Sequence, residues 1–167
     1  MPSLRVRANA LDLRLYKRIR SVARTPETVR WVRAYSQLGE HGAIWLAAGT
    51  AATALDGARR GRWARATGTV GAAYLISTSI KLAIGRKRPL VEDLPHLMAT
   101  PTGLSFPSSH STSSFAAARA FGRLVPPGPL YLAAVAMGLS RLYLGVHYPS
   151  DVAAGAALCT ALGSLGR

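Results

Sequence analysis

Two long basic side chains, Lys81 and Arg88, lie seven residues apart near the middle of the chain. On a helix this spacing is two turns, so both side chains would lie on one face, about 10 Å apart along the axis. Pro89 follows directly and would end that helix. Two cations on one face can converge on one multivalent anion, such as a phosphate group. Taken alone, the cluster could equally be the basic flank of a membrane helix.

A second group of chemically useful residues, Ser108, Ser109 and His110, follows Pro107 at the expected start of a later helix. Small hydroxyl residues are preferred at a helix N-cap. The unpaired N–H groups of the first turn point out of the helix end and bind phosphate well. We therefore expect a phosphate cradle here, with an imidazole beside it, although an ordinary N-cap would have the same sequence.

The third group, Arg141, His147 and Asp151, crosses an expected turn between two helices, and Pro149 suits the first position of the second helix. A carboxylate four residues after a histidine can hold one imidazole N–H and leave the other nitrogen as a nucleophile. The residues leave open which of His110 and His147 attacks phosphorus. The adjacent carboxylate favours His147.

The elements that must position these groups are predicted from hydropathy and charge, which are segregated along the chain. Of 167 residues, 49% are hydrophobic, and 21 Lys and Arg face only 7 Asp and Glu. Apolar stretches at about 38–55, 66–84, 110–125, 129–143 and 149–165 approach the length of a bilayer crossing. Nine cations precede residue 34: Arg5, Arg7, Arg14, Lys17, Arg18, Arg20, Arg24, Arg30 and Arg33.

This pattern predicts an all-α integral membrane bundle of about five transmembrane helices. Residues 1–34 would be a basic amphipathic segment, with its helix on the membrane surface, and residues 35–167 the transmembrane domain. Arg119 and Arg123, four residues apart in the third span, would snorkel to the interface. The alternatives are a soluble helical bundle and a nucleic-acid-binding N-terminal arm. Five helices that are apolar all round leave few polar faces for a soluble globule.

Because the last four spans alternate in direction, all three polar groups must face one side of the bundle. Cations, helix-end amides and two histidines suffice for phosphoryl transfer without a metal. Only Glu92 and Asp93 form a carboxylate pair, and a two-metal phosphatase needs more ligands. We therefore expect neither a metal nor a cofactor.

Together, these residues resemble the three-part motif of the type 2 phosphatidic acid phosphatase family of membrane lipid phosphatases. The resemblance covers residues 81–151, in order and with every internal spacing kept: Lys81-x6-Arg88-Pro89, Pro107-Ser108-Ser109-His110 and Ser140-Arg141-x5-His147-x3-Asp151. Ser109 stands where the family usually has glycine, and it still offers a backbone N–H. The family commonly has six spans, against five counted here.

The resemblance implies a metal-independent phosphatase that acts through a phosphohistidine. His147 would attack phosphorus, Asp151 would orient it, and His110 would protonate the leaving oxygen. The residues implied to hold the phosphate oxygens are Lys81, Arg88, Ser108, Ser109 and Arg141. A phosphotransferase, in which another hydroxyl intercepts the phosphohistidine, is the alternative enzyme. A membrane-anchored nucleic-acid-binding or scaffold protein is the alternative from a different class.

Small actinobacterial members of this family are linked to decaprenylphosphoryl-5-phosphoribose, a polyprenyl-phosphate sugar with a terminal phosphate. The resemblance therefore implies a lipid-phosphate substrate, the membrane as partner, no nucleic acid, and a place in cell wall biosynthesis. Residues 90–106 are expected to roof the pocket, where Glu92, Asp93 and His96 could bond sugar hydroxyls. Phosphatidylglycerol phosphate, phosphatidic acid and polyprenyl diphosphate are the other candidate substrates.

The side of the membrane that the site faces follows from the cations outside the motifs. The nine N-terminal cations would lie on the side of the site, and five would lie opposite: Arg59, Arg60, Arg62, Arg65 and Arg123. The positive-inside rule then predicts a multi-pass cell-membrane protein with a cytoplasmic N-terminus and a cytoplasm-facing site.

Overall fold

The computed structural model describes residues 4–22 and 24–165, with side chains over 9–22 and 24–159. Residues 1–3 and 23 of the N-terminal segment, and the C-terminal Arg167, lie outside the described residues. The described part is helical, and its one β-bridge, between Lys87 and Leu104, forms no strand. This confirms the predicted all-α class.

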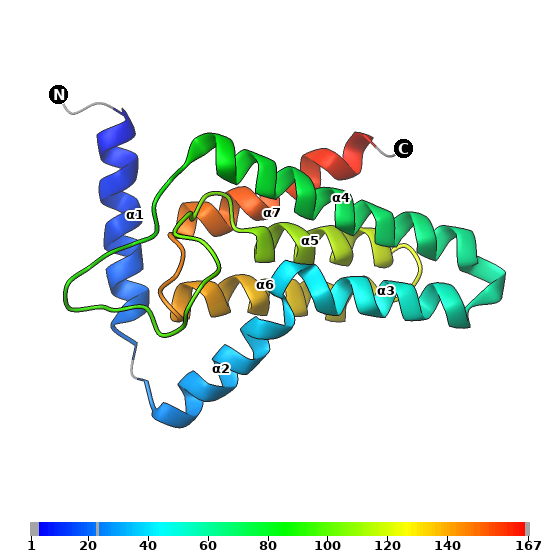
Figure 1. Ribbon diagram of the computed structural model, residues 1–167, viewed down its shortest axis with the longest axis horizontal. Coiled ribbons are helices and arrows are strands. Elements are labelled where there is room, and N and C mark those ends of the chain that lie inside the picture. Colours follow the sequence, from blue (N-terminus) through cyan, green and yellow to red (C-terminus); the bar gives the residue numbers. More distant parts are fainter. Residues whose placement is uncertain (1–3, 23, 166–167) are drawn as a thin grey trace.

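Five helices run along the long axis of the molecule and form its bundle (Figure 1). They are α3 (Ala43–Leu55), α4 (Arg60–Ile84), α5 (Ser109–Phe121), α6 (Pro127–Tyr143) and α7 (Pro149–Leu165). Helix α5 is central, because it packs against α4, α6 and α7. Small residues such as Ala117 and Ala118 are fully buried on it and let the neighbouring helix backbones approach closely.

The aromatic part of the core lies where α3, α4 and α5 meet. Trp45, Trp63 and Phe121 pack there with Val70, and the rings of Trp63 and Phe121 are 5.4 Å apart. The Trp45 indole donates a hydrogen bond of 2.8 Å to Ser114 Oγ. This bond gives the indole N–H of the buried Trp45 ring a hydrogen-bond partner.

The boundaries of the bundle helices differ from the predicted spans at three places. Helix α3 begins only at Ala43, after the short 3-10 helix η1 (Glu40–Gly42). His41 and Gly42 have φ values of 53° and 71° there, so the chain turns sharply instead of continuing one helix. Helix α4 begins at Arg60, six residues before the predicted start, and α5 already ends at Phe121.

The N-terminal segment folds as two helices, where the sequence predicts one amphipathic helix. Helix α1 (Leu4–Arg20) ends before Thr25, whose side chain caps α2 (Pro26–Leu38) with Pro26 at its first position. Helix α1 lies across one end of the bundle (Figure 1) and contacts α6 and α7. Leu11, Leu13 and Val22 are exposed, whereas Tyr16 is buried against this end.

None of the described helices is both long enough and apolar enough to cross a bilayer. Helix α4 has 25 residues but contains Arg60, Arg62, Arg65 and Lys81, while α3 and α5 have 13 residues each. The structure therefore does not confirm the predicted number of five spans.

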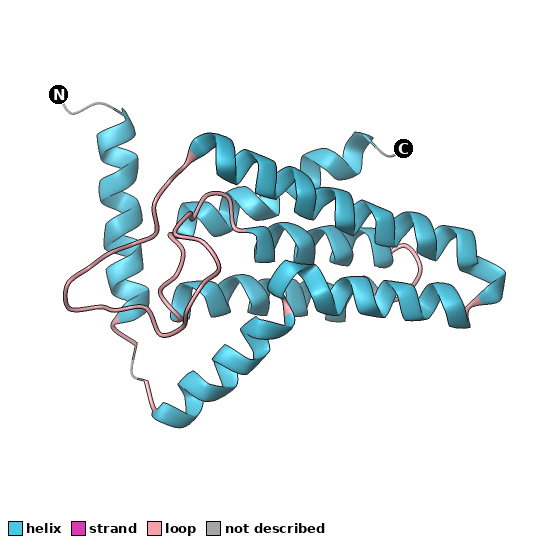
Figure 2. Cartoon of the chain, in the orientation of Figure 1, coloured by secondary structure: helices cyan, strands magenta, loops and turns pink. Residues whose placement is uncertain are grey.

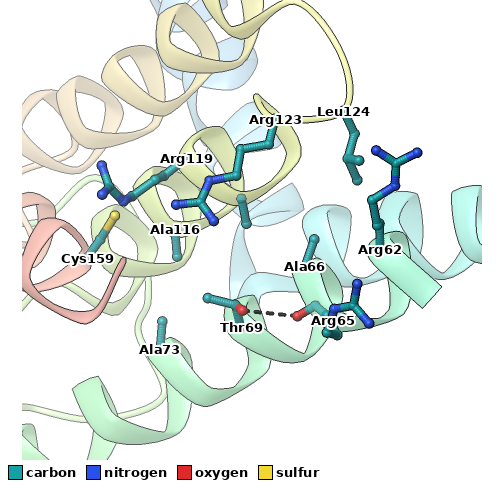
Figure 3. Close-up of a pocket in the computed structure, with 11 residues that line it drawn as sticks. Arg62, Arg65, Ala66, Thr69, Ala73, Ala116, Arg119, Arg123, Leu124 and Cys159 are labelled. Carbon is teal, nitrogen blue, oxygen red and sulfur yellow. Dashed lines mark hydrogen bonds between the residues drawn. The ribbon is translucent and has the colours of Figure 1, made fainter. Parts of the chain in front are cut away.

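The two ends of the bundle carry different structures. The long 85–108 segment and the short 144–148 loop lie at the end near α1, where α4 and α6 finish and α5 and α7 begin (Figure 2). At the opposite end, Arg119 and Arg123 line an open cleft together with arginines of α4 (Figure 3). The predicted gathering of the motifs at one end is thus what the fold produces.

Candidate active site

A small cavity of about 90 Å³ opens at the end of the bundle near the 85–108 segment. It brings together side chains from all three sequence motifs, although these are up to 66 residues apart: Lys81, Arg88, Ser109, His110, Arg141 and His147. Helices α4, α5 and α6 and the two loops each contribute at least one of these residues. Ser108 and Asp151 are fully buried behind the wall and do not line it.

The Lys81 ammonium, at the end of α4, is held by backbone carbonyls of the loop that precedes α5. Its Nζ donates to the carbonyl oxygen of Pro107 at 2.6 Å and to that of Ser105 at 3.3 Å. Carbonyls orient the ammonium but do not neutralise it. Its charge is therefore available to an anion in the cavity.

Arg88 and Arg141 are also held mainly by neutral groups. Arg88 donates through Nη1 to the carbonyl oxygen of Val146 at 2.6 Å, and Arg141 donates through Nη1 to Ser36 Oγ at 2.6 Å. The side chain of Arg88 is 9% exposed and that of Arg141 is 1% exposed. Buried charges without carboxylate partners are costly, which marks this cavity as an anion site.

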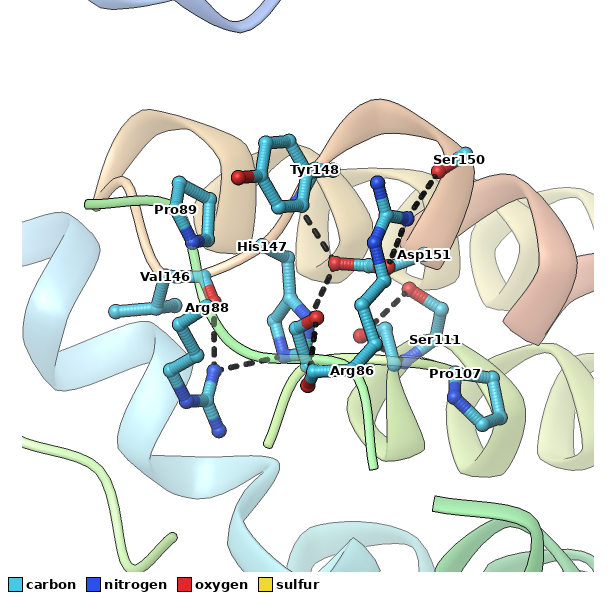
Figure 4. A network of polar contacts seen from close by, with 12 residues as sticks. Arg86, Arg88, Pro89, Pro107, Ser111, Val146, His147, Tyr148, Ser150 and Asp151 are labelled. Atoms are coloured by element: carbon cyan, nitrogen blue, oxygen red, sulfur yellow. Dashed lines mark hydrogen bonds and ion pairs between the residues drawn. The ribbon is translucent and has the colours of Figure 1, made fainter. Parts of the chain in front are cut away.

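The 144–148 loop and the start of α7 fix the orientation of the His147 ring (Figure 4). Arg88 Nη1 lies 3.2 Å from Nε2, and a guanidinium can only donate, so Nε2 must carry the lone pair. The proton then sits on Nδ1, which faces Asp151 Oδ2 at 3.4 Å. The nitrogen on the cavity side is therefore the one with nucleophilic character.

The surroundings keep the His147 imidazole neutral. Burial lowers the pKa of His147 well below its ordinary value, and the nearby charges of Arg141, Arg88 and Lys81 lower it further. The pKa of Arg88 is also lowered, chiefly by burial. A neutral imidazole is the form that can act as a nucleophile.

Asp151 is held by donors on both carboxylate oxygens. Oδ2 accepts the backbone N–H of Tyr148 at 2.8 Å, and Oδ1 accepts from Arg86 Nη1 at 2.8 Å. Arg86 also donates through Nη2 to Asp12 Oδ2 at 2.7 Å. Arg86, which is not one of the motif residues, thus connects the Asp151 carboxylate to helix α1.

Helix α1 therefore supports the site, a role that its sequence did not indicate. Asp12 is 6% exposed and accepts the backbone N–H of Ser150 at 3.0 Å, in addition to the bond from Arg86. Tyr16 donates to the carbonyl oxygen of Gly145 at 3.2 Å. The one available signal was Asp12 itself, which is the only acid in the sequence of α1.

His110 lies in the first turn of α5 and lines the cavity. Its Nε2 is buried and has no hydrogen-bond partner among the described residues. The nearest carboxylate oxygen, Glu40 Oε2, is 3.9 Å away. Glu40 was not among the predicted site residues, although it is a charged residue at the start of an otherwise apolar stretch.

The two serines of the second motif have different environments. Ser108 is the N-cap of α5: its side chain accepts from the N–H of Ser111, and its own N–H donates to the carbonyl oxygen of Asp151 at 2.9 Å. Ser109 lines the cavity, and its hydroxyl accepts from Ser77 Oγ at 3.1 Å. Of the two residues expected to hold phosphate, the structure therefore places only Ser109 on the cavity wall.

The structure does not bring Glu92, Asp93 and His96 to the cavity. The two carboxylates are exposed, and His96 Nε2 lies 2.6 Å from the carbonyl oxygen of Pro89. The residues of the 90–106 segment that do line the cavity are Pro101 and Thr102. The sequence identified a segment that reaches the cavity but not which of its residues line the wall, because an irregular loop has no periodicity from which its inward positions can be read.

A metal centre has no obvious ligands in this region. Within residues 9–22 and 24–159, where side chains are described, no group of three or more His, Cys, Asp or Glu side chains is placed to hold a metal ion. The cavity instead offers three cations and two imidazoles. Such groups bind a phosphate and transfer it between a nitrogen nucleophile and water.

Comparison with known proteins agrees with this chemistry. The model of the PAP2 superfamily matches residues 62–166. Decaprenylphosphoryl-5-phosphoribose phosphatase from Mycolicibacterium smegmatis is 38% identical over 136 residues, which cover 81% of this chain and 75% of that protein. Among solved structures, Aquifex aeolicus LpxE superposes with a TM-score of 0.79 at 25% identity and covers 93% of both chains.

A second solved structure is the first transmembrane PAP2 type phosphatidylglycerolphosphate phosphatase from Bacillus subtilis. It superposes with a TM-score of 0.76 at 25% identity and covers 95% of this chain and 83% of that one. The family match spans more than half of the chain and includes all three motifs. The chain therefore belongs to the PAP2 superfamily and is a phosphoric monoester hydrolase.

Proposed function

We propose that this protein hydrolyses the phosphomonoester of a lipid-linked substrate through a phosphohistidine formed on His147. The observation that carries the proposal is the cavity itself, in which Lys81, Arg88 and Arg141 surround two imidazoles and are held by neutral groups. Such a cavity favours a group that carries two negative charges. It also provides a nucleophile and a second proton-transfer group within the same small volume.

In the first step, the lone pair on His147 Nε2 attacks phosphorus, and the bond between phosphorus and the lipid-side oxygen breaks. The Nδ1 proton stays on the ring and faces Asp151, which compensates the positive charge that the ring gains. His110 gives a proton to the departing oxygen, and Glu40 provides a nearby counter-charge for that imidazole. The three cations stabilise the charge on the transferring oxygens.

In the second step, water enters in place of the lipid alcohol. His110, now neutral, takes a proton from the water as the water oxygen attacks phosphorus. The bond between phosphorus and Nε2 breaks, inorganic phosphate forms, and the lone pair returns to His147. The hydroxyl and amide of Ser109 line the same wall and would help to hold the phosphate oxygens.

A membrane location is part of this proposal, with the bundle of α3 to α7 embedded and the site facing the cytoplasm. Large apolar side chains are exposed on the bundle, including Leu75 (64%), Leu82 (67%) and Leu132 (72%). Acyl chains would cover these side chains better than water does. The nine cations before residue 34 support the cytoplasmic orientation.

For the substrate, we propose a polyprenyl-phosphate sugar phosphate such as decaprenylphosphoryl-5-phosphoribose. Relatives with this substrate in their names match most of the chain, and lipid A 1-phosphatase from Rhizobium etli matches 53% of it at 40% identity. The cavity of about 90 Å³ suits one phosphate group and leaves the sugar and the polyprenyl chain outside. The terminal monoester is therefore the group expected to react.

The test is phosphate release by the purified full-length protein in detergent. The substrates are decaprenylphosphoryl-5-phosphoribose, phosphatidylglycerol phosphate, phosphatidic acid and a polyprenyl diphosphate, with His147→Ala as the control. We expect the highest kcat/KM on the sugar phosphate, unchanged by a chelator, and a base-stable, acid-labile phosphoryl group on His147 during turnover. Faster phosphate release from phosphatidic acid would overturn the proposed substrate. Turnover by His147→Ala would overturn the proposed mechanism.

A further inference from the structure

A wide cleft lies at the other end of the bundle and takes no part in the chemistry above. It is an open cleft of about 590 Å³ between α4, α5 and α7 (Figure 3). A cleft of this size is in the range that binds small organic ligands. Four arginines line it: Arg62 and Arg65 from α4, Arg119 from α5 and Arg123 from the turn that follows α5.

The charged side chains among the described residues that line this cleft are all arginines. None of the described residues that line it is Asp or Glu. The acid nearest in sequence, Asp56, is engaged by Arg59 Nε at 2.6 Å and by the Trp63 indole at 3.1 Å. Arg119 lies in the last turn of α5 and Arg123 in the turn that follows it, so like charges that repel each other gather at this end of α5. An anion placed among the four guanidinium groups would relieve this repulsion.

The rest of the cleft is apolar and elongated. Its remaining lining residues are mostly small and uncharged: Ala66, Thr69, Ala73, Ala116, Ala120, Leu124 and Cys159. On α4 alone the lining extends from Arg62 to Ala73, which is eleven residues or about 16 Å along the helix. Figure 3 shows Arg62 near Leu124 at one end of this groove and Ala73 at the other.

We propose that this cleft binds an anionic phospholipid. The arginines would hold the phosphodiester, and an acyl chain would lie along the small-residue groove between α4 and α5. Guanidinium groups pair well with phosphate oxygens, and a groove with one charged end and one apolar end matches a molecule with the same division. The ligand is a phosphodiester, so this site is distinct from that of the monoester substrate and does not depend on the proposed reaction.

Native mass spectrometry of the full-length protein in a non-ionic detergent tests this proposal. The probes are phosphatidylglycerol, phosphatidylcholine and glycerol 3-phosphate. The charge variant is Arg119→Gln with Arg123→Gln, and Thr69→Phe fills the groove while all four arginines stay. The matched control is Arg18→Gln with Arg60→Gln, which removes two exposed arginines that do not line the cleft.

We expect phosphatidylglycerol to bind with a stoichiometry of one, and both cleft variants to weaken that binding by at least about tenfold. The control pair should bind as the unmodified protein does. Equal weakening in the control pair would mean general charge attraction, and equal binding of glycerol 3-phosphate would mean an anion site without a place for the chain. Either result, or unchanged binding in folded cleft variants, would overturn the proposal. Thermal unfolding midpoints within a few degrees of the unmodified protein establish that the variants are folded.

Discussion

Cations gather at both ends of the helical bundle, but their surroundings differ. At the active-site end, Lys81, Arg88 and Arg141 are at most 9% exposed, and Lys81 and Arg88 are fixed by carbonyl oxygens. At the opposite end, Arg62 and Arg123 are exposed on the rim of a wide cleft. Burial with neutral partners gives charge at fixed positions, which chemistry requires. Exposure gives charge that can adapt to a ligand.

Replacing the two histidines should show the largest difference in turnover between variants at the two ends of the bundle. We expect His147→Ala and His110→Ala each to lower kcat by about 10²- to 10⁴-fold, the range for the loss of one proton-transfer group, with more for the nucleophile. Arg60→Gln, at the far end, should keep kcat within about twofold. Phosphate release under saturating substrate measures this. A His147→Ala protein with full turnover would refute the mechanism.

The second contrast compares one arginine from each end. Arg141→Gln should raise the inhibition constant of orthovanadate, which mimics the five-coordinate transition state, by about 10- to 100-fold. A hydrogen bond to a charged group contributes about 1.5–3 kcal/mol, which is this factor. Arg123→Gln should change the constant by less than about twofold. Equal effects would show that both ends act on the anion through long-range charge alone.

A smaller effect is expected from helix α1, which touches the active-site end without reaching the cavity. Asp12→Asn keeps an oxygen for the Ser150 N–H but loses the charge that pairs with Arg86. We expect kcat to fall about tenfold, or 1.4 kcal/mol, because Asp151 and His147 lose part of their support. KM should stay within about twofold, since the cavity cations are untouched. Arg14→Gln on the exposed face of α1 is the control, and a rise in KM at constant kcat would contradict a positioning role.

The serines at the start of α5 should separate stability from activity. Ser108→Ala removes the N-cap bond to Ser111 and should cost about 1 kcal/mol of stability. Ser109→Gly should leave kcat within about tenfold, because the wall keeps its backbone N–H and the polarity of the helix end. Thermal unfolding and turnover of both variants are the measurements. A collapse of turnover in Ser109→Gly would make the hydroxyl itself an essential phosphate ligand.

The smallest expected effect is a change of protein stability with pH that arises from His147 at the active-site end. Because the pKa of His147 is lowered in the fold, the unfolded chain binds the proton more readily below about pH 6.5. Stability is therefore fully present above that pH and falls as the pH decreases toward the folded pKa. The drop in the unfolding midpoint from pH 7 to pH 5 should be smaller in His147→Gln than in the unmodified protein. An equal drop in both would contradict this assignment.

The motif residues could be found from the sequence because their types and spacings were sufficient. Pro107 and Pro149 lie at the starts of α5 and α7, and alternating helices then had to place these ends together. The prediction that Pro89 ends the helix of Lys81 was wrong: α4 ends at Ile84, before Gly85 with a φ of 65°, so Arg88 lies in the loop and not on the helix face of Lys81. The helical class and the ends of α4, α6 and α7 followed from long apolar stretches and their breakers. All of this information is local or depends only on the order of the elements.

The supporting residues depended on tertiary contacts. Asp12 meets Arg86 across 74 residues, and Arg141 meets Ser36 across 105, distances over which no periodic pattern relates two positions. The break of the N-terminal segment into α1 and α2 was readable in Thr25 and Pro26, yet the burial of Tyr16 was not. The sequence also did not show that Pro101 and Thr102, and not Glu92 and Asp93, line the cavity.

By itself, the sequence determined the helical class and the motifs that gather at one end of the bundle, because residue type, spacing and hydrophobic period are properties of short segments. Only the tertiary structure decided that Ser109 lines the cavity while Ser108 caps a helix. It also decided that α1 braces Asp151 through Arg86, and that four arginines share one cleft at the far end. The physical reason is that side-chain partners are selected by packing in three dimensions, where two helices that approach each other fix contacts that neither segment specifies alone.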